Sequence, residues 1–154
     1  MTKDDFTALI ATITKEIDGM PVDESLTAVL TEKFPPGGET FEQVFQACKA
    51  AIGEGWMCEL GEPELKYGRV LKPTEQTHNF SVDVVDMTEV VGPHHVHPKG
   101  EVDMIMPLTE GAEFDGHPHG WCVYPPMSAH KPTVTGQAIV LYLLPDGAIE
   151  FTRG

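Results

Sequence analysis

The sequence is poor in cysteine, in basic residues and in long apolar runs, and each shortage excludes a class of protein. Its three cysteines, Cys48, Cys58 and Cys122, are odd in number and form no CxxC pair, which excludes a disulfide framework and a zinc site built on thiolates. No apolar run approaches the roughly 18 residues that cross a bilayer. The start, MTKDDFTALI, carries two aspartates and lacks the basic start and cleavage site of a signal peptide. We therefore expect a cytoplasmic protein that does not span a membrane.

Basic residues number only 10 against 24 acidic ones, which gives a formal net charge of −14 at pH 7. Nucleic acids and anionic membrane surfaces bind proteins through a basic footprint, so we expect neither as a partner. A small anionic substrate is compatible with this charge if a cationic side chain meets it inside a pocket. The chain has 154 residues, of which 41% are hydrophobic, and this is enough for one domain with a real core.

The first third of the chain has the apolar spacing of helices. One helix is expected between Thr2, a possible N-cap, and Gly19, and a second, shorter helix before Pro35–Pro36. Their apolar residues are Phe6, Leu9, Ile10, Ile13 and Ile17 in the first, and Leu26, Val29 and Leu30 in the second.

A third helix is expected to begin at Thr40 and to end at Gly53, with Gln43 placed to complete a capping box. Its apolar stripe is typical of a helix that packs on a core. We therefore expect residues 1–54 to form a helical segment that packs on the rest of the chain as one compact unit.

After Gly55 the apolar pattern changes to that of strands. Phe80, Val82 and Val84 alternate with polar residues, and turn residues separate further short β-like runs. Many short strands at such spacing are typical of a sandwich or a barrel. The run 138–144 is apolar on both faces, so one face should line a barrel and the other should meet helices or a second subunit. The expected strands are 56–60, 66–72, 78–86, 101–108, 120–125, 138–144 and 148–152.

The stretch GPHHVHPKGEVDMIMPL, residues 92–108, contains three of the seven histidines. On a strand, His95 and His97 point to one face and His94 to the other. The PKG sequence that follows is typical of a turn, so the next strand runs back and brings Glu101 to the level of the histidines. Two imidazoles and a carboxylate on one wall are typical ligands of a divalent metal ion.

A fourth ligand is available in YPPMSAHKP, where His130 ends the motif. Three histidines and one glutamate suit Fe, Mn, Ni or Zn and leave coordination positions open, as catalysis requires. The alternative is that an HxH pair is ordinary surface or core histidine. His117 and His119 form a second such pair among turn residues, and we expect them in an exposed loop or at a pocket rim. The chain contains no GxGxxG or P-loop, so no nucleotide cofactor is expected.

The pattern HxHxxxE followed by PxxxxH resembles the two metal-binding motifs of the cupin superfamily. The resemblance implies a mainly β fold, with a cupin-like antiparallel β-barrel (jelly roll) over residues 55–154 after the helical segment. Two departures are visible: the usual glycine of the first motif lies further upstream than Gly92, and Met127 replaces the glycine of PxGxxH, which should alter the turn and narrow the pocket. The resemblance assigns the metal to His95, His97, Glu101 and His130.

Longer blocks, HNFSVDVVDMTEVVGPHHVHPKGEVDMIMPL, GWCVYPPMSAHKPTV and LYLLPDGAIEF, are similar to the 4-hydroxylaminobenzoate lyase family, as is the helical start before a barrel. This resemblance implies a carbon–nitrogen lyase that converts 4-hydroxylaminobenzoate to 3,4-dihydroxybenzoate (protocatechuate) and ammonia in nitroaromatic degradation. The resemblance does not establish a role for the metal, and we expect metal assistance from the ligand set itself. Two other hypotheses remain open. One is a metal-dependent cupin dioxygenase that acts on a small aromatic substrate and uses the same metal ligands. The other is a non-enzymatic cupin that binds a ligand without converting it.

Further residues are candidates for the chemistry around the metal. Asp103 shares a strand face with Glu101 and should point inward, either as a general acid or base beside Glu101 or as a partner that orients a ligand histidine. Arg69 is the candidate for binding the carboxylate of a small aromatic substrate, although a solvated surface arginine is the plainer interpretation. Tyr124 is a candidate for the wall of an aromatic pocket, with ordinary core as the alternative. The other candidates for that wall are Trp56, Phe80, Trp121 and Tyr142.

Assembly can also be predicted. The run 138–144 is apolar on both faces, and the N-terminal helices are amphipathic. Together they present more apolar surface than one small barrel needs for its own core. We therefore expect a homodimer, the commonest closed arrangement of a soluble oligomer.

Overall fold

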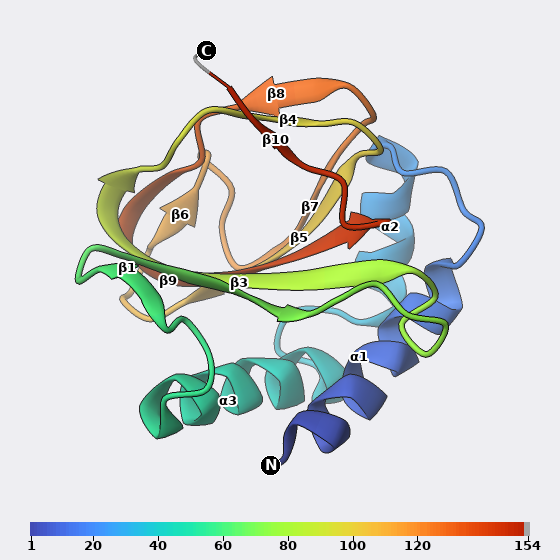
Figure 1. The fold of residues 1–154 in the computed structure, drawn as a ribbon, viewed down its shortest axis with the longest axis horizontal. Helices are drawn as coiled ribbons and strands as arrows, with labels where there is room; N and C mark the ends of the chain where they lie inside the picture. The colour runs from blue at the N-terminus through green and yellow to red at the C-terminus, as the bar shows by residue number, and fades with distance from the viewer. Residues whose placement is uncertain (153–154) are drawn as a thin grey trace.

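The computed structural model describes residues 1–152, in which three helices precede a set of antiparallel strands (Figure 1). The fold is mainly β with a helical N-terminal segment, as expected. The helices are α1 (Lys3–Ile17), α2 (Glu24–Lys33) and α3 (Glu39–Glu54). The strands are β1 (Leu60–Glu62), β2 (Leu65–Leu71), β3 (Phe80–Val91), β4 (His95–His97), β5 (Glu101–Pro107), β6 (Glu113–Phe114), β7 (Gly120–Tyr124), β8 (Ser128–His130), β9 (Thr133–Pro145) and β10 (Glu150–Phe151).

The strands form two sheets. The larger has the order β1-β2-β3-β9-β5-β7, with β6 paired to β9, and the smaller has the order β10-β4-β8. Figure 1 shows the smaller sheet above one face of the larger one, α1 and α3 below the other face, and α2 at the side, next to β7. No hydrogen-bonded ladder joins the two sheets into one closed barrel within residues 1–152.

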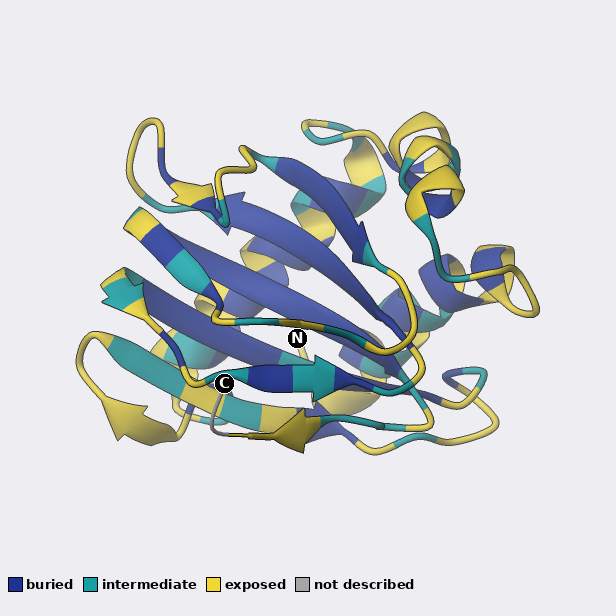
Figure 2. Cartoon of the chain, turned by 90° about the horizontal axis from the view of Figure 1, so that it is seen from above, coloured by how far each residue is buried: buried dark blue, intermediate teal, exposed yellow. Residues whose placement is uncertain are grey.

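Strand β9 lies between β3 and β5 in the larger sheet, and its residues 138–144 are buried on both faces. Figure 2 shows the middle strands of this sheet largely buried, in dark blue, whereas β1 and much of β2 are exposed or half-buried. On one face Ile139, Leu141 and Leu143 belong to a core that includes the buried side chains of all three helices. On the other face Val140 and Tyr142 belong to a second core between the sheets. The prediction that one face of 138–144 meets helices is therefore confirmed. The helices that pack on this face belong to the same chain.

The first helix begins as predicted, but the third does not. Thr2 and Asp5 exchange hydrogen bonds in a capping box at the start of α1. The N-cap of α3 is Gly38, without a side-chain cap, so the predicted capping box at Thr40 is wrong. Instead, Glu42 in the first turn of α3 accepts a hydrogen bond from the Gly37 backbone N–H, at 3.2 Å.

The boundary between helices and strands also differs from the prediction. Helix α3 continues through Gly53 and ends at Gly55, whose φ of 88° is the left-handed conformation that closes helices. The predicted strand 56–60 is wrong for most of its length, because Met57 and Cys58 are buried in bends and β1 begins only at Leu60.

Two sequence-based exclusions can be checked directly. Cys48, Cys58 and Cys122 are buried free thiols, which confirms that they form no disulfide. No helix within residues 1–152 is both long and apolar enough to span a membrane.

Candidate metal and substrate site

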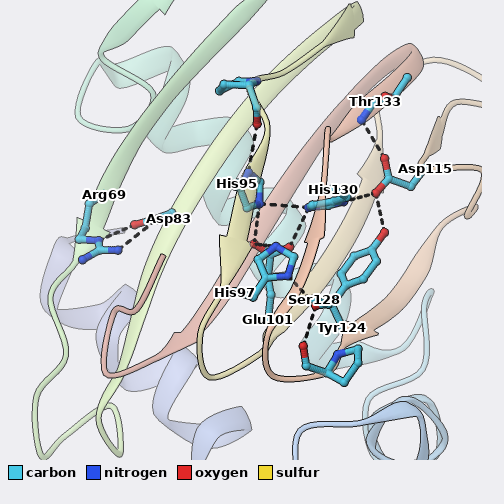
Figure 3. Close-up of polar contacts among 12 residues, drawn as sticks. Arg69, Asp83, His95, His97, Glu101, Asp115, Tyr124, Ser128, His130 and Thr133 are labelled. Atoms are coloured by element: carbon cyan, nitrogen blue, oxygen red, sulfur yellow. Dashed lines mark hydrogen bonds and ion pairs between the residues drawn. The ribbon is translucent and has the colours of Figure 1, made fainter. Parts of the chain in front are cut away.

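Four side chains converge between the sheets: His95 and His97 from β4, Glu101 from the first position of β5, and His130 from β8. One ligand atom from each lies within 4.8 Å of the others. Antiparallel pairing of β4 with β8 places His95 directly opposite His130, and the turn after His97 returns the chain to Glu101. Figure 3 shows the three rings directed towards the Glu101 carboxylate. The structure therefore brings together the four residues that the sequence singled out.

The spacing within this cluster matches that of ligands around one ion. The two Nε2 atoms of His95 and His130 are 3.0 Å apart, and Nε2 of His97 is 3.3 Å from Oε1 of Glu101. Glu101 also lies 3.5 Å from Nε2 of both His95 and His130. Ligands about 2.1 Å from one ion and at right angles to each other are about 3.0 Å apart. The donor set fits a divalent cation.

The cluster also contains buried polar atoms without hydrogen bonds. Within residues 1–152, Nε2 of His97 and both carboxylate oxygens of Glu101 are buried and have no hydrogen-bond partner. A buried polar group left unsatisfied costs about 1–3 kcal/mol, and more if it is charged. A cation at the centre of the cluster would satisfy all three atoms.

Each ring is held by its other nitrogen, Nδ1. In His95 this atom is 3.2 Å from the carbonyl oxygen of Pro93, and in His97 it is 2.9 Å from the hydroxyl of Ser128. In His130 it is 2.5 Å from a carboxylate oxygen of Asp115. Carbonyl and carboxylate oxygens accept hydrogen bonds, so Nδ1 of His95 and His130 carries the proton and Nε2 faces the cluster.

Asp115 was missed as a site residue, because in the sequence Asp115–Gly116 indicates only a turn. Its carboxylate also accepts from the Tyr124 hydroxyl, at 2.5 Å, and from the Thr133 backbone N–H, at 2.8 Å. No local signal in the sequence links this turn to the histidine motif.

The electrostatics of the cluster follow from these contacts. Burial alone would raise the pKa of Glu101, but contacts with His130, His95 and His97 lower that pKa well below its usual range. Burial alone would lower the pKa of His130, whereas the contacts with Asp115 and Glu101 raise it to about 9. A proton and a metal ion compete for Nε2, so metal binding at His130 releases protons.

Asp103 faces the same interior as Glu101, as expected from their spacing on β5. It is fully buried, opposite Cys122 on β7 and Tyr142 on β9. Neither of its carboxyl oxygens has a hydrogen-bond partner within the described part of the chain. Burial and then the charge of Glu101 raise the pKa of Asp103 well above its usual range.

A pocket of about 570 Å³ opens beside the cluster. His95 lines one part of it and the Arg69–Asp83 pair another, and Figure 3 shows this pair apart from the histidines. Tyr142 lies in the wall, with its ring centroid 6.4 Å from that of His95. The remaining lining is mostly apolar: Leu65, Tyr67, Gly68, Val85, Met87, Gly92, Pro93, Pro132, Ile149 and Phe151.

Arg69 is bound in place rather than free. Its Nε donates to Oδ1 of Asp83 at 2.7 Å, and its Nη2 donates to Oδ2 of Asp83 and to the Gly147 carbonyl, each at 3.2 Å. Its side chain is 35% exposed. Among the lining residues Arg69 is the one lysine or arginine.

Other sequence candidates lie elsewhere. Tyr124 is outside the lining of this pocket and packs against His97 and His130, with ring centroids 5.4 and 4.5 Å away. Met127 does adopt the left-handed conformation of a motif glycine, with φ of 66°. Its side chain is 72% exposed and does not line the pocket, so the expectation that it narrows the pocket is wrong.

The remaining histidines named from the sequence do not join the cluster. His94 bonds to the Thr152 hydroxyl. His117 is exposed, as expected. His119 is half-buried, packs against Phe41 with a centroid distance of 5.0 Å, and lies 3.4 Å from Glu42.

Comparison with known proteins finds close relatives by sequence. The profile of the PnbB family, described as 4-hydroxylaminobenzoate lyase, matches residues 8–151. The chain is 36% identical to a 4-hydroxylaminobenzoate lyase of Nocardioides sp. (strain LMS-CY) over 147 residues, 88% of this chain and 86% of the relative. It is 27% identical to a 4-hydroxylaminobenzoate lyase of Pseudomonas putida over 167 aligned positions, 97% of this chain and 95% of the relative.

Among solved structures the likeness is more distant. An RmlC-like cupin protein from Ralstonia eutropha JMP134 is similar over 60% of this chain and 62% of its own, with a TM-score of 0.42 and 10% identity. The polyketide cyclase RemF from Streptomyces resistomycificus is similar over 60% of this chain and 73% of its own, again with a TM-score of 0.42 and 10% identity.

Proposed function

The chain belongs to the 4-hydroxylaminobenzoate lyase family, and we propose that it converts 4-hydroxylaminobenzoate and water to 3,4-dihydroxybenzoate and ammonia, in the degradation of nitroaromatic compounds. The observation that carries this proposal is the family match over residues 8–151. That span includes the whole histidine–glutamate cluster and every residue that lines the pocket.

The reaction is redox-neutral, so it needs no nicotinamide or flavin. The N–O bond breaks with its electron pair leaving on oxygen, which departs as water after protonation. A second water adds to the ring carbon beside the nitrogen. Hydrolysis of the resulting imine releases ammonia, and loss of the ring proton restores the aromatic ring. The protein must therefore hold the ring, promote departure of the hydroxyl oxygen, and admit water first at the carbon beside the nitrogen and then at the imine carbon.

We propose that His95, His97, Glu101 and His130 hold a divalent metal ion. The support is the 3.0–3.5 Å spacing of their ligand atoms and the three unsatisfied buried atoms in the cluster. When bound, such an ion supplies a Lewis acid able to polarise the N–O bond or to activate water. The donor set accepts Fe, Mn, Ni or Zn alike.

The pocket suggests how the substrate is oriented. We propose that Arg69 binds the ring carboxylate, since an anionic substrate in so acidic a protein needs a local cation and no other lysine or arginine lines the pocket. Asp83 engages Nε and Nη2 of Arg69 and fixes the plane of the guanidinium, while Nη1 has no protein hydrogen bond within residues 1–152. The hydroxylamine then lies towards His95, with the ring between apolar walls.

Two carboxyl groups are candidates for moving protons. Glu101 touches all three ligand histidines, and Asp103 lies two residues further on the same strand face without a hydrogen-bond partner in the described chain. We propose that Asp103 exchanges protons with the reacting water or with the departing oxygen. Tyr124 lies outside the pocket lining and supports the site by donating a hydrogen bond to Asp115, so we propose no contact between Tyr124 and the substrate.

Anaerobic turnover tests the proposed activity. Metal-loaded protein is incubated with 4-hydroxylaminobenzoate without oxygen, the catechol is detected by chromatography, and ammonia is assayed separately. We expect both products in equal amounts. Turnover only in the presence of oxygen would favour a dioxygenase, and tight binding without product would favour a binding protein; either result would reject the lyase.

We also propose that the protein is a homodimer. Helices of the same chain cover the outer face of β9, so the apolar run 138–144 does not itself require a second subunit. Apolar side chains remain exposed near the pocket mouth, among them Leu60 (57%), Tyr67 (46%) and Phe151 (66%). Light scattering across micromolar concentrations should give twice the chain mass, and a monomer mass throughout would reject the dimer.

A further inference from the structure

Asp115 occupies the tip of a tight hairpin. Phe114 and His117 exchange backbone hydrogen bonds of 2.9 and 2.8 Å across Asp115 and Gly116. Both central residues have positive φ, 51° and 79°, which is the geometry of a type I′ turn and explains an Asp-Gly pair. The turn does not explain where the carboxylate points.

The Asp115 carboxylate meets three donors from three different strands. Its Oδ2 accepts from Nδ1 of His130 on β8 and from the hydroxyl of Tyr124 on β7, each at 2.5 Å. Its Oδ1 accepts from the backbone N–H of Thr133 on β9 at 2.8 Å. A carboxylate is an acceptor on both oxygens, so it satisfies all three donors, which an amide cannot do.

The three histidines of the cluster are therefore supported unequally. His95 is held by a backbone carbonyl and His97 by the Ser128 hydroxyl, both uncharged. Only His130 is held by a charged group. A carboxylate on the far nitrogen fixes the tautomer and the ring plane of a ligand histidine and makes it a stronger donor to a metal ion.

We propose that Asp115 is the positioning residue of the metal centre: it orients His130 and strengthens Nε2 of that ring as a ligand, without touching the ion itself. This inference rests on the proposed metal site. Both oxygens of Asp115 are occupied by protein donors, and Asp115 is not one of the four residues whose ligand atoms converge.

One substitution separates this role from that of the turn. Asp115→Asn keeps the hairpin, because Asn-Gly is favoured in type I′ turns. Its amide NH2 group must, however, face one of the three donors, so at least one contact is lost and the negative charge beside His130 is removed. Glu113→Gln is the matched control: it removes one negative charge from the same hairpin, at an exposed residue with no side-chain hydrogen bond or ion pair among residues 1–152.

The experiment measures Zn(II) affinity by competition with a chromophoric chelator, and records the visible spectrum of the Co(II)-loaded protein. We expect Asp115→Asn to weaken Zn(II) binding about 10- to 100-fold and to shift the Co(II) bands, with thermal stability of the metal-free protein nearly unchanged. Glu113→Gln should leave both readouts as in the wild type. Wild-type affinity and spectrum in Asp115→Asn would overturn the role of Asp115, whereas a wild-type protein that binds neither ion would overturn the metal site itself.

A second variant covers the case in which Asp115→Asn fails to fold. Tyr124→Phe removes one donor from Oδ2 and leaves the carboxylate in place, so His130 is held less firmly. We expect several-fold weaker Zn(II) binding by a protein of near wild-type thermal stability. Unchanged affinity in this variant would overturn the inference.

Discussion

Nε2 of His95 and Nε2 of His130 lie 3.0 Å apart, although 35 positions separate the two residues in the chain. Pairing of β4 with β8 places the residues opposite each other, and the hydrogen bonds at Nδ1 turn each ring so that Nε2 faces inward. Two nitrogen lone pairs at this distance repel each other unless a proton or a metal ion lies between them. The close approach of these two nitrogens therefore requires either a shared proton or a bound metal ion between them.

Loss of the ligand histidines should abolish metal binding. We expect His97→Ala and His130→Ala each to reduce the bound metal to a small fraction of the wild-type amount, because each removes one of four donors. His119→Ala is the control, since that ring packs against Phe41 outside the cluster. Elemental analysis of protein purified without added metal measures the outcome, and full occupancy in the double ligand variant would refute the assignment.

Arg69 should determine affinity for the substrate carboxylate. A hydrogen bond to a charged group contributes about 1.5–3 kcal/mol, so Arg69→Met should lower kcat/KM by about 10- to 100-fold. Inhibition by benzoate should weaken in parallel. Lys66→Met on the same strand is the matched control, because Lys66 does not line the pocket. Equal effects of the two substitutions would show that general charge, and not a specific contact, is responsible.

Metal binding should stabilise the fold. An ion that binds only the folded state adds about 2.7 kcal/mol at a free concentration one hundred times Kd. We expect a chelator to lower Tm measurably in the wild-type protein, since it leaves the buried atoms of His97 and Glu101 unsatisfied again. His130→Ala should show little response to the chelator. A wild-type Tm that is the same with and without chelator would contradict this prediction.

The helices should unfold together with the sheets. Phe41 on α3 is fully buried and packs edge-on against Trp121 of β7, with ring centroids 5.7 Å apart. Phe41→Ala should therefore lower the free energy of unfolding by about 3–5 kcal/mol, as for other large buried aromatics. Phe151→Ala, at a residue that is 66% exposed, should change it by less than about 0.5 kcal/mol. Denaturant unfolding followed by fluorescence and by circular dichroism measures both, and non-coincident transitions would indicate that the helical segment unfolds separately.

The local pattern of the sequence determined most of the elements and one half of the site. Helical spacing predicted α1, including its N-cap at Thr2, and alternation predicted the long strands of the larger sheet. The two-residue period of a strand placed His95 and His97 on one face, and the PKG turn brought Glu101 back to them. These features follow from backbone geometry over a few residues, so they can be inferred without knowing the fold.

Tertiary structure decided what lies opposite that half. The sequence named His130 from its motif, but it is the pairing of β4 with β8 that places His130 opposite His95. A turn that looked purely structural places the carboxylate of Asp115 against Nδ1 of His130. Asp83 accepts hydrogen bonds from Nε and Nη2 of Arg69. Tyr142, and not Tyr124, lines the pocket together with His95. Such contacts join residues from strands that are distant in the chain. They depend on which strands pair and how the sheets pack, and the free energy that selects this arrangement comes from the whole core rather than from any short segment.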